Sequence, residues 1–202
     1  MVTTGCYMAG LYMSAAVPLF PAFLKLADRP VVIVGGGPVA TAKLSALLEA
    51  NARVTVVAPE VTPTIAGSGV TIRRRSFIAS DLDDAWLAVA AAPRGVNRVV
   101  AEAAETRRVF VNAVDDPPHA SVYLGGVVRR GGVTVAISTN GQAPALAGLI
   151  RQALETLLPE DEVERWMSVA RDQRAEWTLA GIPIDQRRPL LLRALASLYE
   201  DR

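Results

Sequence analysis

The chain has 202 residues, of which 51% are hydrophobic and 20% charged, with a formal net charge of +1. This composition predicts one folded domain with a smaller appendage and excludes a disordered chain. The near-neutral charge argues against nucleic-acid binding as the main function. A single cysteine, Cys6, and a single histidine, His119, exclude an internal disulfide and a metal site built from cysteines or from several histidines.

The N-terminal residues 1–17 are mildly apolar, but no basic residue precedes their apolar stretch. Glycine, serine and threonine interrupt the segment, and it is too short to span a bilayer. We therefore interpret 1–17 as a disordered extension. We expect no membrane contact and a location in the reducing cytoplasm.

From residue 18 to residue 113, short β-branched runs alternate with helical patterns. Strands are expected at 31–34, 53–57, 70–75, 86–90 and 109–111, and helices at 41–49, 61–66 and 95–106. Repeated strand–helix units with apolar strands predict an α/β fold, a Rossmann-type parallel sheet with helices on both faces. In the first helix, Leu44, Leu47 and Leu48 are expected to pack on the sheet.

The most informative local motif is VVIVGGGPVA at 31–40, in which a strand turns through glycines into a helix; the glycine pattern alone is a weak signal, and the flanking strand and helix strengthen it. Unpaired N–H groups at such a helix N-terminus attract phosphate. Gly35 allows the tight turn, Gly37 lets the backbone approach a pyrophosphate, and Ala40 stands where a third glycine usually packs helix on strand. A dinucleotide is therefore expected at this turn.

The fingerprint of such sites places an acidic residue near the end of the second strand, where it holds a ribose hydroxyl. Here that position is Ala58, and Glu60 follows two residues later. Glu60 either binds the ribose or is a favourable charge at a helix N-terminus. No arginine follows immediately to receive a 2′-phosphate, so the residues favour NAD without deciding between NAD and NADP.

A second informative stretch, VFVNAVDDPPHAS at 109–121, comes at the fifth strand. Open α/β sheets bind ligands beyond the carboxyl ends of their strands, so Asn112, Asp115 and Asp116 are expected to face the crevice of the glycine turn. A carboxylate there could transfer a proton in a redox reaction. It could equally cap the turn through local backbone hydrogen bonds.

After Asn112 the pattern changes. Two β-rich runs, 121–128 and 133–138, are joined by Arg-Arg-Gly-Gly and predict a hairpin, and amphipathic helices follow at 142–158, 161–179 and 185–200. These elements make a thin core on their own. We expect their apolar faces to pack against a second copy in a homodimer; the alternative is a monomer with the helices folded back on the sheet.

A third stretch, at the end of the hairpin, is rich in hydrogen-bond donors. Ser138, Thr139, Asn140 and Gly141 end a strand and precede a helix. This arrangement predicts either a second anion site or plain capping of the helix by Thr139 or Asn140.

Five segments of the chain carry a family resemblance. They are PLF at 18–20, VVIVGGGPVA at 31–40, VTVVAPE at 54–60, VNAVDDP at 111–117 and AISTNGQAPALA at 136–147. Together they resemble the precorrin-2 dehydrogenase family, the N-terminal module of siroheme synthases. The resemblance runs from about Pro18 to the C-terminus, and we expect no methyltransferase domain like that of the fused enzymes.

This resemblance implies NAD-dependent oxidation of precorrin-2 to sirohydrochlorin, a step towards siroheme or cobalamin, with insertion of ferrous iron by some members. It also implies a dimer of chains with three parts. We assign them to 18–113, the NAD-binding Rossmann domain, to 114–141, a β dimerisation segment, and to 142–202, a helical domain.

The resemblance also assigns residue roles. Pro38, Val39, Pro59 and Glu60 would contact NAD, Asp115 would transfer a proton, and Asn112 with Ser138–Gly141 would line the tetrapyrrole pocket. Asp116 adds a second carboxylate beside Asp115 and leaves the proton-transfer group open between the two.

Because the substrate is a large polycarboxylate, Arg129, Arg130 and Arg151 are candidate cations at the rim of its cleft. Two other functions remain open. One is a non-enzymatic dimeric module that senses NAD, and the other is a chelatase without dehydrogenase activity.

Overall fold

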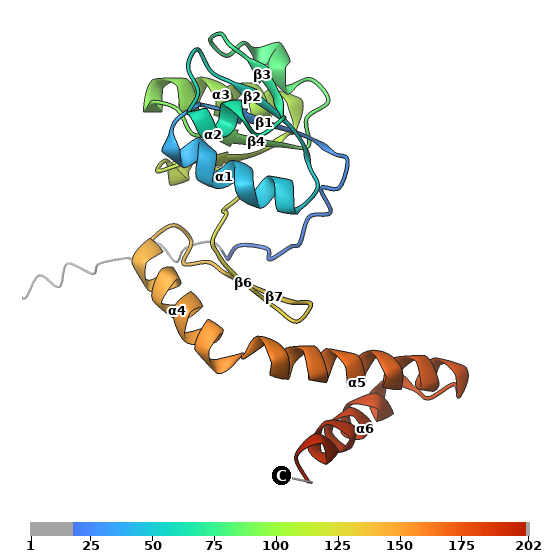
Figure 1. The fold of residues 1–202 in the computed structure, drawn as a ribbon. Helices are drawn as coiled ribbons and strands as arrows, with labels where there is room; N and C mark the ends of the chain where they lie inside the picture. Colours follow the sequence, from blue (N-terminus) through green and yellow to red (C-terminus); the bar gives the residue numbers. More distant parts are fainter. Residues whose placement is uncertain (1–17, 201–202) are drawn as a thin grey trace, which may run out of the picture.

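The computed structural model describes residues 18–200, so the expectation for 1–17 lies outside the described residues. Its largest element is a five-stranded parallel sheet (Figure 1) with strand order β3-β2-β1-β4-β5. The strands are β1 (Pro30–Val34), β2 (Arg53–Val57), β3 (Thr71–Arg73), β4 (Leu87–Ala90) and β5 (Phe110–Ala113). This order is that of a Rossmann fold and confirms the predicted fold class.

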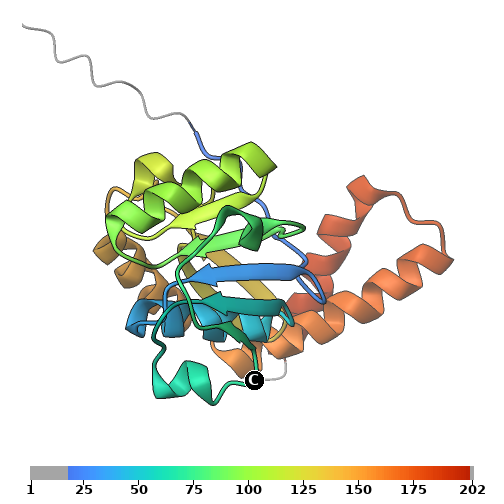
Figure 2. The ribbon, with the colours of Figure 1, turned by 90° about the horizontal axis from the view of Figure 1, so that it is seen from above.

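Helices cover both faces of this sheet, as the strand pattern predicts. Helices α1 (Pro38–Glu49) and α2 (Pro63–Ala66) lie on one side, and α3 (Arg94–Arg107) lies on the other (Figure 2). A short 3-10 helix, η1 (Ala79–Leu82), packs with α3. Because helices cover both faces of the sheet, every β1 side chain from Val31 to Val34 is buried.

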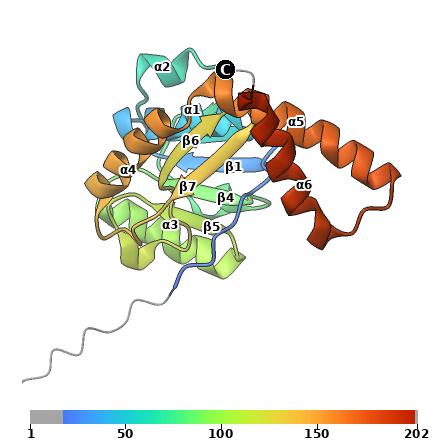
Figure 3. The same ribbon diagram turned by 90° about the horizontal axis from the view of Figure 1, so that it is seen from below.

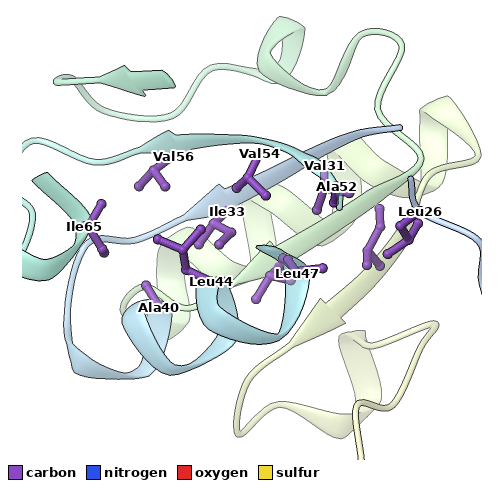
Figure 4. Close-up of a cluster of buried hydrophobic side chains, with 12 residues drawn as sticks. Leu26, Val31, Ile33, Ala40, Leu44, Leu47, Ala52, Val54, Val56 and Ile65 are labelled. Atoms are coloured by element: carbon purple, nitrogen blue, oxygen red, sulfur yellow. The ribbon is translucent and has the colours of Figure 1, made fainter. Parts of the chain in front are cut away.

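Alternate strand residues divide the core into two clusters. Val31 and Ile33 of β1 join the cluster under α1 (Figure 4), whereas Val32 and Val34 join the cluster under α3. Helix α1 contributes Leu44 and Leu47 to its cluster. The prediction for Leu48 was wrong: it is 39% exposed, because it lies just outside the narrow apolar face of α1.

Strands β1 and β4 differ from the prediction by one residue at their start, whereas β3 and β5 also end at other residues than predicted. Strand β3 ends at Arg73 rather than at Arg75, since the chain turns there to place Arg75 beside Asp81. Strand β5 continues to Ala113, so Asn112 lies inside the strand, where its backbone pairs with Val89 of β4.

The antiparallel hairpin consists of β6 (Gly126–Arg130) and β7 (Val133–Ile137). Its turn contains Gly131 and Gly132, both at positive φ, as the Arg-Arg-Gly-Gly signal predicts. The first strand starts later than predicted. The reason is that Ser121 and Val122 are held against β5, where their amides both donate to the carbonyl of Val111.

Three helices complete the chain: α4 (Pro144–Leu157), α5 (Glu160–Leu179) and α6 (Ile184–Ala196), followed by the short η3 (Ser197–Tyr199). Helices α4 and α5 run to opposite sides of the hairpin, and α6 folds back along α5 (Figures 1 and 3). Many of their large apolar side chains are exposed to solvent. On α4, Leu149 is 63% exposed and Leu157 is 71% exposed. Within residues 18–200, no helix is both long and apolar enough to cross a membrane.

Candidate dinucleotide and substrate site

The glycine turn is wedged between the loops that follow β2 and β4. A Cβ added at Gly35, where φ is 124°, would lie 2.2 Å from the carbonyl oxygen of Ala91. A Cβ added at Gly36 would lie 1.9 Å from the carbonyl oxygen of Glu60. Side chains at these two positions are therefore excluded by the backbone itself.

Gly37 differs from its two neighbours. It is the N-cap of α1, with an ordinary φ of −84°, and a Cβ built there would meet nothing within 4 Å. Pro38 follows as the first residue of the helix. The space above Gly37 is thus open at a helix N-terminus, which is the arrangement a pyrophosphate requires.

A cavity of about 560 Å³ opens at this turn, beyond the carboxyl ends of the strands. Its walls come from the loops after four strands: Gly35–Gly37 after β1, Pro59 and Glu60 after β2, Ser76 and Phe77 after β3, and Ala91–Pro93 after β4. The two central strands, β1 and β4, flank the switch point of the sheet, where Rossmann folds bind dinucleotides. We call this cavity the dinucleotide crevice.

A second cavity, of about 360 Å³, adjoins the crevice. Residues Ala91–Pro93 line both cavities, so a single stretch of backbone separates them. The second cavity is completed by Val39 of α1, by Arg94 and Asn97 of α3, and by Val114 and Asp115 after β5. We call it the Asp115 cavity.

The two neighbouring carboxylates are placed differently. Asp115 lines its cavity in a left-handed backbone conformation, with φ 55°. Within residues 18–200, no hydrogen bond or ion pair is found for its carboxylate, so it caps no turn there. Asp116 lies 2.9 Å from Nδ1 of His119 and lines neither cavity. Of these two aspartates, only Asp115 lines a cavity beside the dinucleotide crevice.

Asn112 has a different position from the one predicted. Its side chain is buried, and its Nδ2 donates to the carbonyl of Val122 at 2.9 Å. Its Oδ1 is buried with no protein partner among the described residues. Asn112 lines neither cavity and ties β5 to the segment that leads into the hairpin.

The stretch 138–141 lies against the loop that carries Asp115. A Cβ at Gly141, where φ is 74°, would come within 3.3 Å of Pro117 and 3.2 Å of Tyr123. Its hydroxyls are used locally: Ser138 Oγ accepts from the Asn140 amide, and Thr139 Oγ1 accepts from the Ala143 amide, each at 3.2 Å. The stretch borders the Asp115 loop without lining either cavity.

The arginines predicted at the cleft rim have other neighbours. Arg129 lies 3.7 Å from Glu49 of α1, and Arg151 pairs with Glu155 along α4 at 2.6 Å. Arg130 donates to the carbonyl of Arg129. None of the three lines either cavity: the hairpin places Arg129 beside α1, and Arg151 is paired along its own helix, α4.

The sequence analysis missed two residues of α3 at the site. Asn97 is 2% exposed; its Oδ1 accepts from the Ala92 amide at 2.9 Å, and its Nδ2 donates to the Val114 carbonyl at 3.4 Å. It therefore joins the loops after β4 and β5. Arg94 is the one basic residue in the described walls of the two cavities. Their position directly after the fourth strand is the signal that could have identified them.

The sequence analysis also missed Ser76 and Phe77, which form part of the wall of the dinucleotide crevice. The buried carboxylate of Asp81 lies behind this wall. Asp81 accepts from Arg73 at 2.5 Å, from Arg75 at 2.5 and 2.7 Å, and from the Ile78 amide at 3.0 Å. Burial raises the pKa of Asp81, but the hydrogen bonds from Arg75, Ile78 and Arg73 outweigh it and lower the pKa to about 2. The carboxylate is thus ionised at any physiological pH.

A family model described as "Putative NAD(P)-binding" matches residues 22–126, slightly more than half of the chain. The chain belongs to this family. A second model, "Sirohaem biosynthesis protein central", matches residues 130–157, which cover the hairpin turn, β7 and α4. The match confirms the prediction of a nicotinamide dinucleotide cofactor, and the open Gly37 and the crevice fit that group.

Curated relatives include siroheme synthases. The chain is 42% identical over 145 residues to siroheme synthase 3 of Aeromonas hydrophila subsp. hydrophila and 44% identical over 145 residues to that of Citrobacter koseri. These alignments cover 69% of this chain but 31% and 32% of the relatives, so the chain spans about a third of their length.

A solved structure shares the fold of the chain. "SirC, precorrin-2 dehydrogenase" superposes with a TM-score of 0.68 at 24% identity, covering 87% of this chain and 88% of that one. The likeness extends over the Rossmann sheet, hairpin and helices together, and it supports the predicted combination of these three parts.

The contrast between two glycines generates a prediction. Gly35→Ala places a Cβ against the Ala91 carbonyl at a positive φ, and should lower the free energy of unfolding by more than about 2 kcal/mol. Gly37→Ala should leave it nearly unchanged but weaken NAD binding about tenfold, because its Cβ would enter the space above the helix N-terminus. Urea unfolding and calorimetric titration measure the two quantities. Wild-type NAD affinity in Gly37→Ala would place the pyrophosphate elsewhere.

Proposed function

We propose that this chain catalyses the NAD-dependent dehydrogenation of precorrin-2 to sirohydrochlorin, in siroheme or cobalamin synthesis. The observation that carries the proposal is the shared wall between the dinucleotide crevice and the cavity lined by Asp115. The relatives named siroheme synthase and the fold shared with a precorrin-2 dehydrogenase support the choice of substrate.

The residues of the crevice bind and orient the dinucleotide. Gly37 and Pro38, at the N-terminus of α1, would hold its pyrophosphate, and Pro59 and Glu60 would bound its adenosine side, while Val39 lines the Asp115 cavity. Bound NAD supplies the hydride acceptor. The Glu60 carboxylate would repel the 2′-phosphate of NADP, and the nearby Arg73 and Arg75 are engaged by Asp81, so we assign NAD rather than NADP.

The reaction removes two electrons and two protons from precorrin-2. One hydride goes to the cofactor, and the remaining proton needs an acceptor at the substrate. The Asp115 carboxylate stands in the cavity beside the crevice without a protein partner in the described chain and is the proposed acceptor. General-base catalysis of this kind typically contributes a hundredfold or more in rate.

The substrate carries many carboxylates, and Arg94 provides a positive charge in the Asp115 cavity. No ion pair or side-chain hydrogen bond is found for Arg94 in the part of the chain that the structure describes. We assign it to one substrate carboxylate. We place the rest of the macrocycle towards Ser138, Thr139, Asn140 and Gly141, which lie against the same loop. Asn112 ties β5 to Val122, the residue before Tyr123, against which Gly141 lies.

The exposed apolar face of α4 supports a homodimer. Leu146, Leu149, Ile150 and Leu157 are between 39% and 71% exposed, although they follow helical spacing. A patch of this kind on an amphipathic helix is typical of a subunit interface. We propose that α4 and the hairpin meet their counterparts in a second copy of the chain.

Replacement of Asp115 tests the catalytic assignment. Asp115→Asn should lower kcat about a hundredfold or more while leaving NAD affinity intact, because the carboxylate lines the substrate side of the shared wall. Asp116→Asn is the matched control and should retain most of the activity. The change in visible absorption as precorrin-2 is oxidised gives the rates. A greater loss in Asp116→Asn than in Asp115→Asn would transfer the role to Asp116.

Arg94→Gln should raise the KM for precorrin-2 about tenfold without changing the KM for NAD, since it removes a counter-charge from the substrate cavity. Arg98→Gln is the control on the same helix: it breaks only an exposed pair with Glu102. Steady-state kinetics with each substrate varied separates the two constants. An increase confined to the KM for NAD would show that Arg94 faces the dinucleotide instead.

The dimer proposal is tested at α4. Leu149→Glu should convert a dimer into a monomer, because it places a charge in the centre of the apolar face. Val99→Glu, at a position 52% exposed on α3, is the control and should not change the mass in solution. Light scattering after gel filtration measures both, and a monomeric wild-type chain would contradict the proposal.

The same preparations separate the proposed function from its alternatives. A sensor would bind NAD without oxidising precorrin-2, and a chelatase alone would act on sirohydrochlorin without NAD. Ferrous or cobaltous ion added after oxidation tests metal insertion, with the metal as a substrate. Among residues 18–200, no group of three or more His, Cys, Asp or Glu side chains gathers where it could hold an ion.

A further inference from the structure

Asp81 is a buried charge that the proposed reaction does not use. Its side chain has no exposed surface, and it accepts hydrogen bonds from two arginines and one amide. A buried carboxylate is costly in free energy unless it is fully paired. Moving any of these donors away would leave the charge of Asp81 unpaired, so the hydrogen bonds hold Arg73, Arg75 and the Ile78 amide in place. Asp81 lines neither the dinucleotide crevice nor the Asp115 cavity.

The bonds of Asp81 enclose one short segment. Arg73 is the last residue of β3, Arg75 follows two residues later, and Ile78 precedes η1, so the carboxylate holds both ends and the interior of 73–78. Between these points lie Ser76 and Phe77, the part of the crevice wall contributed by the loop after β3.

The same segment is joined to the loop after β2. The carbonyl of Arg73 accepts from the amide of Ala58 at 3.2 Å, and Pro59 and Glu60 of the crevice wall follow Ala58 directly. In a Rossmann fold the adenosine ribose lies at the end of the second strand. The segment held by Asp81 therefore forms the outer wall on the adenosine side.

We propose that Asp81 is a positioning residue for the dinucleotide: through Arg73 and Arg75 it holds Ser76 and Phe77 in the shape that receives the adenosine half. Asp81 does not contact the dinucleotide or the substrate. Its loss therefore weakens binding of the cofactor in the ground state and in the transition state equally, which raises the KM for NAD and leaves kcat unchanged. The inference needs a bound nicotinamide dinucleotide, and only its kinetic readout rests on the proposed function.

The chain offers a matched control two residues away. Asp83 also pairs with an arginine, Arg107 of α3, at 2.9 Å, but its carboxylate is 61% exposed and holds no part of the crevice wall. Asp83→Asn thus removes an aspartate–arginine pair from the same region without releasing Ser76 or Phe77.

Calorimetric titration of the full chain with NAD is the primary test. Asp81→Asn should raise the dissociation constant for NAD and the KM for NAD about tenfold, with kcat and the KM for precorrin-2 within about twofold of wild type. Arg75→Gln, which removes two of the four bonds to the carboxylate, should raise both NAD constants in the same direction. Asp83→Asn should bind NAD as wild type does.

A folded Asp81→Asn protein with wild-type NAD affinity would overturn the proposal and reduce Asp81 to a structural role, as would a fall in kcat without a change in KM. If Asp81→Asn does not fold, Arg75→Gln decides the question, because its exposed side chain is replaced without emptying the core. A wild-type chain that binds NAD but does not oxidise precorrin-2 would refute the proposed function. The dissociation constants for NAD of the wild type and the variants would still test the role of Asp81.

Discussion

The close approach of three backbone segments at the glycine turn is the constraint on which the rest of the site depends. Gly35 and Gly36 let the carbonyl groups of Ala91 and Glu60 come where side chains would otherwise stand. This contact brings the ends of β1, β2 and β4 together and leaves the N-terminus of α1 open above Gly37. The dinucleotide crevice is therefore a consequence of backbone packing, and the side chains that line it adjust which dinucleotide it prefers.

A second set of hydrogen bonds holds the loop that carries Asp115 beside that crevice. Asn97 joins Ala92 to Val114 from within α3, and Ser121 donates and accepts hydrogen bonds at the two backbone groups of Val111. Asp115 lies between these ties in a left-handed conformation that aspartate tolerates better than most residues. The buried side chain of Asn97 and the hydroxyl of Ser121 thus fix the two ends of this loop, and Asp115, whose carboxylate has no partner in the described chain, lines the cavity between them.

The C-terminal helices have a different source of stability. Helix α5 buries Val163 and Trp177, and η3 is joined to it where the Nε1 of Trp166 donates to the hydroxyl of Tyr199 at 2.6 Å. Helix α4 buries only Ala147 and exposes its large apolar residues. A helix with this pattern gains little from packing within its own chain, and its exposed apolar face is the surface that the proposed dimer would cover.

The residues alone were enough to predict the Rossmann sheet, the glycine turn and its nicotinamide dinucleotide, and the hairpin and helices that follow, because these depend on local periodicity and on glycines required by the backbone. The folded chain was needed to show that Asp115 rather than Asp116 lines a cavity, that Asn112 is buried inside β5, and that Arg129 and Arg151 face glutamates. It also showed Arg94, Ser76, Phe77 and Asp81 at or behind the site. These positions depend on contacts between loops after different strands, and local sequence carries no information on which of two adjacent side chains such a contact turns inward.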